Sequence, residues 1–181
     1  MLRLRPYKPC DAAKIVSWLA DRDVFFRWGG QYCGEYPLTE ESLNDKYIAK
    51  NGGCEEPDNF YPVVAFDEDG PVGHFIMRYL HGDNTMLRFG WVVVDDAKRG
   101  RGYGREMLSL GLLYAFEVLG VQSVTLGVYE NNPKAYRCYT SVGFRASTST
   151  HDKEVEIDGE KWKVIELEMT RDEYEAKKQA R

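Results

Sequence analysis

The sequence predicts an α/β fold built on a mixed sheet, and two features carry that prediction. Three apolar runs, at residues 61–66, 72–80 and 85–94, are separated by short polar turns, which is typical of an antiparallel meander. The third run is followed by an amphipathic stretch, residues 106–119, and then by a β-branched run, residues 123–129. A strand, a helix and a strand in this order form a crossover unit, so the third run and the β-branched run should be parallel.

The chain ahead of the meander predicts one strand and two helices. Residues 2–5 alternate between apolar and charged side chains, and the prolines after them end the strand. Asp11 is a good N-cap for a helix that reaches about residue 20. Thr39 precedes a second helix, whose two leading glutamates suit its positive end. Residues 21–36, between these helices, are rich in aromatic side chains and are expected to be irregular.

A helix and a hairpin follow the crossover unit. Asn132 and Pro133 suit the start of a helix that ends at Gly143. Two further strands, residues 148–157 and 161–170, are joined by an Asp-Gly pair, which is a strong hairpin signal. The order of elements is therefore β-α-α-β-β-β-α-β-α-β-β, an α+β mixed sheet.

The last strand carries one irregularity. Its alternation changes phase between Val164 and Ile165, which predicts either a bulge or a strand buried on both faces. Beyond this strand, residues 171–181 are expected to form a short charged helix as a C-terminal tail.

The composition is that of a soluble globular protein, 43% hydrophobic and 29% charged. The length of 181 residues predicts a single domain over residues 1–181, with its core at about residues 2–170. The net charge of -5 disfavours nucleic-acid binding, and no apolar run approaches the ~20 residues that span a membrane. Four cysteines without metal-ligand spacing predict reduced thiols, no metal site and a cytoplasmic protein.

The turn between the third apolar run and the amphipathic helix carries the clearest functional signal. Its glycines bring backbone N–H groups to a helix N-terminus, where the helix dipole favours an anion, and its arginines add positive charge. It lacks the third glycine of a dinucleotide fingerprint, which argues against an oxidoreductase, and the Lys-Ser/Thr pair of a P-loop. It predicts a pyrophosphate site, unless it is only a glycine turn that opens a helix. The turn consists of Arg99, Gly100, Arg101, Gly102, Tyr103, Gly104 and Arg105.

Two motifs in this element order resemble the GNAT superfamily of N-acetyltransferases. The pattern Q/R-x-x-G-x-G/A, at residues 99–104, is similar to the acetyl-CoA pyrophosphate loop of that family. The second pattern, N-x-x-A-x-x-x-Y-x-x-x-G-F, falls on the helix after the β-branched strand, although its residues singly also suit a helix cap, a packing site and a core tyrosine. The resemblance covers about residues 2–170. The second pattern is met by Asn132, Ala135, Tyr139, Gly143 and Phe144.

The resemblance implies acetyl-CoA as the cosubstrate, no metal, and a binding site shared between the two motifs. The glycine turn would hold the diphosphate. The pantetheine arm would enter where a bulge parts the two parallel strands, and would pair with the backbone of Val92, Val93 and Val94. In the second motif, Asn132, Ala135, Tyr136 and Tyr139 would complete the cosubstrate site.

The resemblance also implies direct attack of an amine on the thioester, with Tyr139 giving a proton to the departing thiolate. Many relatives carry a glutamate on the central strand as general base, but Arg88 stands at that position here. Glu35, His74 and Glu130 remain as candidate bases, acting directly or through water. Each has an ordinary structural alternative, as a solvated acid or as a buried histidine with satisfied hydrogen bonds.

The acceptor is expected to be a primary amine, on a small molecule or a protein N-terminus. The opening residues resemble the branch that includes ribosomal-protein N-terminal and drug or polyamine acetyltransferases, in which a homodimer is one arrangement. The alternative function is a CoA-binding sensor or interaction module without catalysis. This alternative is favoured by Arg88, which stands where many relatives have the glutamate base. Aromatic rings can hold an ammonium by cation–π contact, and can equally be core. The candidate acceptor-lining residues are Phe25, Trp28, Tyr32, Tyr36, Phe75 and Tyr79.

Overall fold

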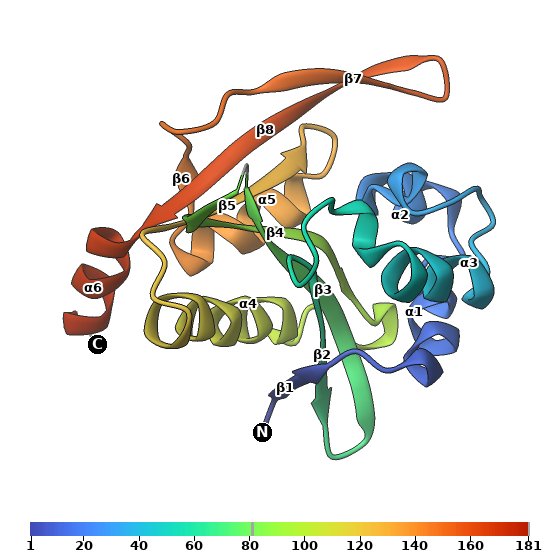
Figure 1. Ribbon diagram of the computed structural model, residues 1–181, viewed down its shortest axis with the longest axis horizontal. Helices are drawn as coiled ribbons and strands as arrows, with labels where there is room; N and C mark the ends of the chain where they lie inside the picture. Colours follow the sequence, from blue (N-terminus) through green and yellow to red (C-terminus); the bar gives the residue numbers. More distant parts are fainter. Residues whose placement is uncertain (81, 181) are drawn as a thin grey trace. The chain divides into compact units, whose positions relative to one another are not determined.

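The computed structural model describes residues 1–80 and 82–180 (Figure 1). The chain divides into two compact units. The first unit comprises Met1–Arg78 and Gly90–Met107, and the second comprises Tyr79–Phe89 and Leu108–Arg181. The polar turn predicted between the apolar runs at residues 72–80 and 85–94 includes His81, which lies outside the described residues.

The predicted meander forms the sheet of the first unit. Its strands pair in the order β1-β2-β3-β4, and β3 and β4 continue into the second unit. The pairing of β1 with β2 and of β2 with β3 is antiparallel, with a register shift between Ala65 and Phe66. The bounds are β1 (Arg3–Pro6), β2 (Tyr61–Asp67), β3 (Gly70–Leu80) and β4 (Asp83–Val94).

The first unit contains one helix more than expected, because residues 21–36 are not wholly irregular. The Asp21 side chain accepts a hydrogen bond from the Val24 N–H (3.0 Å) and caps a helix there. Gly29, with φ of 86°, ends that helix in the left-handed conformation. Phe25 and Trp28 are three residues apart on its buried face. The helices are α1 (Ala12–Trp18), α2 (Arg22–Trp28) and α3 (Glu40–Asn44), which continues into one π-helical turn (Asp45–Ala49).

The second unit confirms the crossover and the C-terminal hairpin. Its strands pair in the order β4-β5-β8-β6, with β7 also on β8, so the described residues form one eight-stranded, mostly antiparallel sheet. The pairing of β4 with β5 is parallel, as predicted, over three residue pairs from Met86↔Ser123 to Arg88↔Thr125. The bounds are β5 (Ser123–Tyr129), β6 (Arg145–Ala146), β7 (Lys153–Ile157) and β8 (Glu160–Thr170).

The phase change in β8 comes from burial on both faces. Its register with β5 runs without interruption from Ser123↔Thr170 to Tyr129↔Val164, so the bulge is wrong and the second expectation is confirmed. Residues 166–169 are all buried, although Glu166 and Glu168 among them are acidic. Both carboxylates have partners, Glu166 in Arg88 and Glu168 in the Ser149 hydroxyl, which allows their face of the strand to be buried as well.

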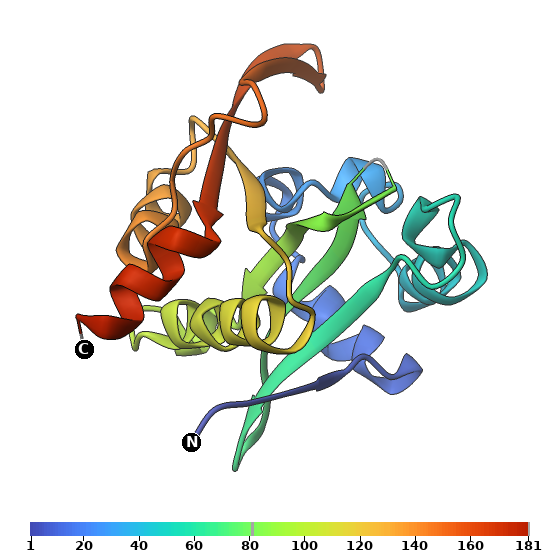
Figure 2. The same ribbon diagram turned by 60° about the vertical axis from the view of Figure 1, so that its left-hand side comes forward.

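The remaining helices are α4 (Tyr103–Leu113), followed by a π-helical turn (Tyr114–Val118), α5 (Pro133–Val142) and α6 (Arg171–Gln179). Figure 2 shows β8 leading directly into α6, where the Thr170 side chain caps the helix. The ring of Tyr174 stacks on Phe116, with centroids 4.6 Å apart, so the tail helix also makes an apolar contact.

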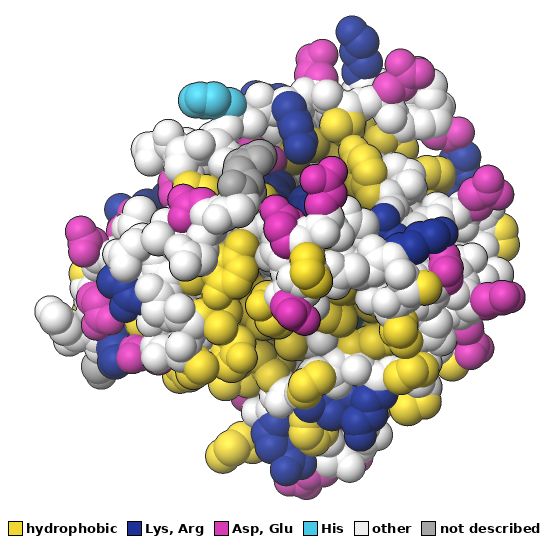
Figure 3. Space-filling view, in the orientation of Figure 1, with side chains coloured by type: hydrophobic (Ala, Val, Ile, Leu, Met, Phe, Trp, Pro, Cys, Tyr) yellow, Lys and Arg dark blue, Asp and Glu magenta, His cyan; other side chains and the backbone are white. Residues whose placement is uncertain are grey.

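Hydrophobic side chains gather over the region of α4 in the space-filling view (Figure 3), and Leu113 and Val118 are among the exposed apolar residues of this helix and the turn after it.

Within the described part of the chain, no helix is long and apolar enough to cross a membrane. Nor do those residues gather three or more His, Cys, Asp or Glu side chains as metal ligands.

Candidate active site

The glycine turn has the geometry of an anion site. Gly100 and Gly102 have φ of 78° and 86°, the left-handed region that glycine adopts without strain. A Cβ atom built on either glycine would meet nothing within 4 Å, so the space above the turn is open. The Glu106 N–H donates to the Gly102 carbonyl (3.0 Å), which leaves the N–H groups ahead of it in the first turn of α4 for an anion.

The three arginines of the turn differ in their contacts. The Arg99 Nε atom donates to the carbonyl oxygen of Val94 (3.1 Å), which ties the turn to the end of β4. Arg101, between Gly100 and Gly102, and Arg105, after Gly104, are both exposed. A guanidinium group can bind a phosphate through two parallel hydrogen bonds, so the turn carries both of the donor types that a diphosphate needs.

The end of β4 is irregular at Trp91. This residue has φ of 47°, a left-handed conformation that a non-glycine residue rarely adopts inside a strand. Its indole N–H donates to the Gly29 carbonyl (3.3 Å), and its ring stacks on Tyr47 with centroids 5.6 Å apart. These contacts hold the backbone in the unusual conformation. The irregularity directly precedes Val92, Val93 and Val94, the residues expected to pair with the pantetheine arm.

The second motif forms α5 and its two ends. The Asn132 side chain accepts a hydrogen bond from the Ala135 N–H (3.2 Å), and Pro133 occupies the first turn, so the predicted start is confirmed. Gly143 ends the helix with φ of 118°. Tyr136 is exposed, whereas Tyr139 is only 7% exposed.

Burial is the main physical feature of Tyr139. It raises the pKa of the phenol, and the neighbouring Cys138 adds to the rise. The hydroxyl is therefore protonated at any working pH and available as a proton donor. Among residues 1–80 and 82–180 it has no hydrogen-bond partner, so its proton is not committed elsewhere.

His74 is a structural residue of the first unit. Its Nδ1 atom lies 2.9 Å from the carbonyl oxygen of Val63, which can only accept, so Nδ1 carries the proton. The Nε2 atom then accepts from the Tyr47 hydroxyl at 2.7 Å. The side chain is fully buried, and burial lowers its pKa from 6.5 to about 4. Both ring nitrogens are occupied, so this candidate base has no nitrogen to offer an amine.

The buried His74 predicts a pH-dependent stability. Its folded pKa lies below the unfolded value, so the unfolded chain takes up a proton first as the pH falls from 6.5 to about 4. The free energy of unfolding should fall over that window by about 3 kcal/mol, at about 1.4 kcal/mol per pH unit. Urea unfolding of the wild type and of a His74→Gln variant at about pH 7 and pH 4 measures this. Equal losses in the two proteins would contradict the assignment.

Arg88 has a structural partner that the sequence did not suggest. Its guanidinium donates to both carboxylate oxygens of Glu166 on β8, at 2.7 and 3.0 Å, and the two side chains are 17% and 3% exposed. A Cβ atom on Gly127 would lie 2.8 Å from the guanidinium and 3.3 Å from the carboxylate. Glycine on β5 therefore makes room for the ion pair to cross that strand.

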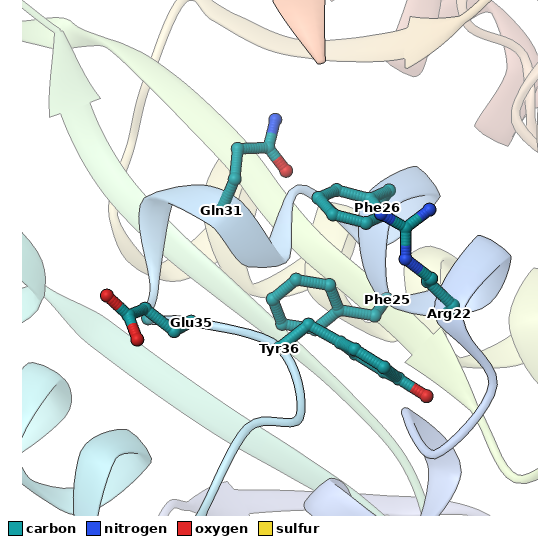
Figure 4. A pocket seen from close by; sticks show the side chains of 7 residues that line it. Arg22, Phe25, Phe26, Gln31, Glu35 and Tyr36 are labelled. Carbon is teal, nitrogen blue, oxygen red and sulfur yellow. The ribbon is translucent and has the colours of Figure 1, made fainter. Parts of the chain in front are cut away.

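A pocket of about 450 Å³ opens on the surface of the first unit (Figure 4). Phe25 forms its floor with its ring centroid 5.4 Å from that of Tyr36. Gly30 is required beside it, because a Cβ atom there would be 2.2 Å from the Phe25 ring. The exposed Glu35 stands at the rim. The lining residues are Arg22, Phe25, Phe26, Gln31, Gly34, Glu35 and Tyr36.

The pocket contains only part of the predicted acceptor set. Phe25 and Tyr36 line it, although Phe25 is itself buried, whereas Trp28 and Phe75 are buried and are not among the lining residues. Tyr32 is exposed outside the lining, and Tyr79 belongs to the second unit. The sequence reasoning missed Arg22 and Phe26, four residues apart on α2, because that helix was not recognised. The Asp21 cap was the signal for it.

The last candidate base, Glu130, is exposed just ahead of α5. Its backbone N–H donates to the Lys163 carbonyl (2.9 Å), which fixes the backbone of the residue. Of the three candidates, Glu35 is the one that lines the pocket described above.

The fold and these motifs define an acyl-CoA-dependent acyltransferase, and comparison with known proteins identifies the family. A family model for the acetyltransferase (GNAT) domain matches residues 1–145, so the chain belongs to the GNAT acetyltransferase family. It is 26% identical over 144 residues to "Uncharacterized N-acetyltransferase YnaD" of Bacillus subtilis, covering 80% of this chain and 79% of that protein. It is 31% identical over 115 residues to the spermine/spermidine N(1)-acetyltransferase of the same species, covering 60% and 72%.

A solved structure shares the fold. Spermidine N-acetyltransferase from Vibrio cholerae, in complex with CoA and spermine, superposes with a TM-score of 0.77 at 20% identity, covering 96% of this chain and 97% of that chain. The chain is accordingly an acetyl-CoA-dependent acetyltransferase, with acetyl-CoA as its cosubstrate.

Proposed function

We propose that this enzyme transfers the acetyl group of acetyl-CoA to a primary amine of a small cationic molecule. The observation that carries the proposal is the pocket of the first unit, whose lining includes both aromatic rings and the Glu35 carboxylate. A polyamine has the required chemistry, and one relative is named as a spermine/spermidine acetyltransferase. A protein N-terminus is the other acceptor class to be tested.

Glu35 and the aromatic rings would hold the ammonium group of the acceptor. The carboxylate supplies the opposite charge, and the exposed ring of Tyr36, packed against the buried Phe25, supplies an apolar wall with a negative face. Arg22 lies over the Phe26 ring, 4.9 Å from its centroid, so that ring already has a cation. The arginine also disfavours a second ammonium at that end of the pocket, which would orient an acceptor with several charges.

The cosubstrate would bind through the glycine turn and the end of β4. The N–H groups of the first turn of α4, together with Arg101 and Arg105, would hold the diphosphate. The backbone of Val92 and Val93 would pair with the pantetheine amides. The Val94 carbonyl already accepts from Arg99, so it would share its second lone pair or exchange partners.

Tyr139 would protonate the thiolate as it leaves. The electron pair of the C–S bond goes to sulfur together with the phenol proton, so free CoA forms as the amide bond closes. The proton that the attacking nitrogen loses on becoming an amide would restore the Tyr139 phenol, directly or through water. The ammonium acceptor must lose a proton before its attack, and the Glu35 carboxylate would accept that proton, directly or through water. Because His74 is occupied by hydrogen bonds, it takes no part in this step.

Replacing Glu35 with glutamine tests the acceptor site. The change removes the negative charge and keeps the shape, so KM for the amine should rise roughly fivefold, the size of an exposed ion pair of about 1 kcal/mol. Because an amide cannot accept the amine proton, kcat should fall as well. KM for acetyl-CoA should stay the same. Initial rates at varied amine concentration measure both, and Glu130→Gln is the matched control because it lies outside the pocket. An unchanged KM for every amine in Glu35→Gln would show that the acceptor binds elsewhere.

A further inference from the structure

Asp67, the last residue of β2, makes contacts that no motif predicted. Its carboxylate accepts from the Lys98 ammonium at 2.9 and 3.1 Å and from the Tyr103 hydroxyl at 2.8 Å. The Asp67 and Lys98 side chains are 10% and 18% exposed. The sequence reasoning treated this region only as a hairpin turn, because its partners are more than thirty residues away.

The two donors bracket residues 99–102, the part of the glycine turn that lies ahead of α4. Lys98 directly precedes this segment and Tyr103, the first residue of α4, directly follows it, so one carboxylate holds both of its ends. Between them, Gly100 and Gly102 have no side chains and nothing packs over them. Glycine is conformationally permissive, so a turn of this kind would lose much conformational entropy when it closes on an anion. Fixing its ends in advance reduces that loss.

We propose that Asp67 is a positioning residue for acetyl-CoA, which holds the glycine turn in the shape that binds the diphosphate. The inference rests on the proposed role of the turn in binding that group. Asp67 itself would not touch the cosubstrate, because its oxygens are occupied by Lys98 and Tyr103. It would act by keeping the backbone N–H groups between these two residues directed at a common point.

The hydrogen bonds of Asp67 persist over the pH range of an assay. The Lys98 ammonium first, and the Tyr103 hydroxyl second, lower the pKa of Asp67 to about 2. The same contacts raise the pKa values of Lys98 and Tyr103. Asp69 also lies 3.6 Å from Lys98, but its side chain is 85% exposed. Near neutral pH the Asp67 carboxylate therefore stays ionised, and Lys98 and Tyr103 both stay protonated.

The test compares two acetyl donors, acetyl-CoA and S-acetylpantetheine, which has the same thioester but no diphosphate. In Asp67→Asn, kcat/KM for acetyl-CoA should fall about tenfold, the effect of one lost hydrogen bond to a charged group. With S-acetylpantetheine, kcat/KM should equal that of the wild type, and kcat at saturating acetyl-CoA should also be unchanged. Tyr103→Phe should shift acetyl-CoA in the same direction. Asp69→Asn, the matched control, should leave both donors unaffected.

The outcomes distinguish a failure of the Asp67 inference from a failure of the diphosphate site on which it rests. Equal losses with the two donors in Asp67→Asn and Tyr103→Phe would mean a general structural role, and no loss with either donor would mean no role; both results overturn the proposal. A wild-type enzyme that uses S-acetylpantetheine as efficiently as acetyl-CoA would contradict the diphosphate site itself, and Asp67 with it. If Asp67→Asn does not fold, as judged by thermal unfolding, Tyr103→Phe decides the question.

Discussion

Replacing Tyr139 with phenylalanine should lower kcat roughly 100-fold or more, which is the size of a general-acid contribution. The hydroxyl is protonated because burial raises its pKa, and no described group holds its proton. Without it the thiolate must leave unprotonated, which makes the transition state less stable. The loss of a single hydroxyl leaves the apolar ring in place, so α5 and the fold should be retained.

Steady-state rates at saturating acetyl-CoA and amine, together with the affinity for CoA, measure this effect. Tyr114→Phe is a suitable control, because that exposed tyrosine follows α4 and has no proposed role in the reaction. A variant Tyr139→Phe with wild-type kcat and intact CoA binding would refute the role of Tyr139 as the acid.

Replacing Arg88 with methionine should destabilise the protein by about 3–5 kcal/mol, the effect of leaving one partner of a buried ion pair alone. The Glu166 side chain is 3% exposed and would keep its charge without a partner. A Glu166→Leu change made in the Arg88→Met background should restore most of the loss, because an apolar pair of similar volume replaces a buried ion pair with little effect on stability.

Urea unfolding of the wild type, both single variants and the double variant gives the coupling energy of the pair. Additive losses in the double variant would contradict the ion pair as the source of the effect. The double variant also addresses the position where many relatives have a glutamate base. Since Arg88 is bound to Glu166 in the structure, kcat of the folded double variant should stay close to that of the wild type.

Local signals predicted most of the fold. β5 begins and ends where the β-branched run does. α5 begins at its predicted cap, because the Asn132 side chain only has to accept a hydrogen bond from the backbone N–H of Ala135, three residues later. The Asp-Gly hairpin formed as expected, since Asp158 and Gly159 both have positive φ, of 54° and 79°. Each of these features depends on residues close together in the chain.

The errors came from tertiary contacts. The phase change in β8 was ambiguous from sequence, because burial on both faces depends on which distant parts of the chain cover each face of the strand. Phe75 was expected in the acceptor site and is core, since the pattern of a strand does not tell which face is covered. The partner of Arg88 is 78 residues away, and Lys98 is 31 residues from Asp67. A local sequence pattern cannot predict ion pairs between residues so far apart in the chain.

The most direct test of the central claim is the release of free thiol from acetyl-CoA in the presence of a panel of amines. The panel should contain polyamines, other small primary amines and peptides with free N-termini, and mass spectrometry should identify the acetylated product. We predict amine-dependent thiol release with at least one small cationic amine, and its loss in Tyr139→Phe. Tight CoA binding without thiol release for any amine would contradict the claim and favour a CoA-binding module without catalysis.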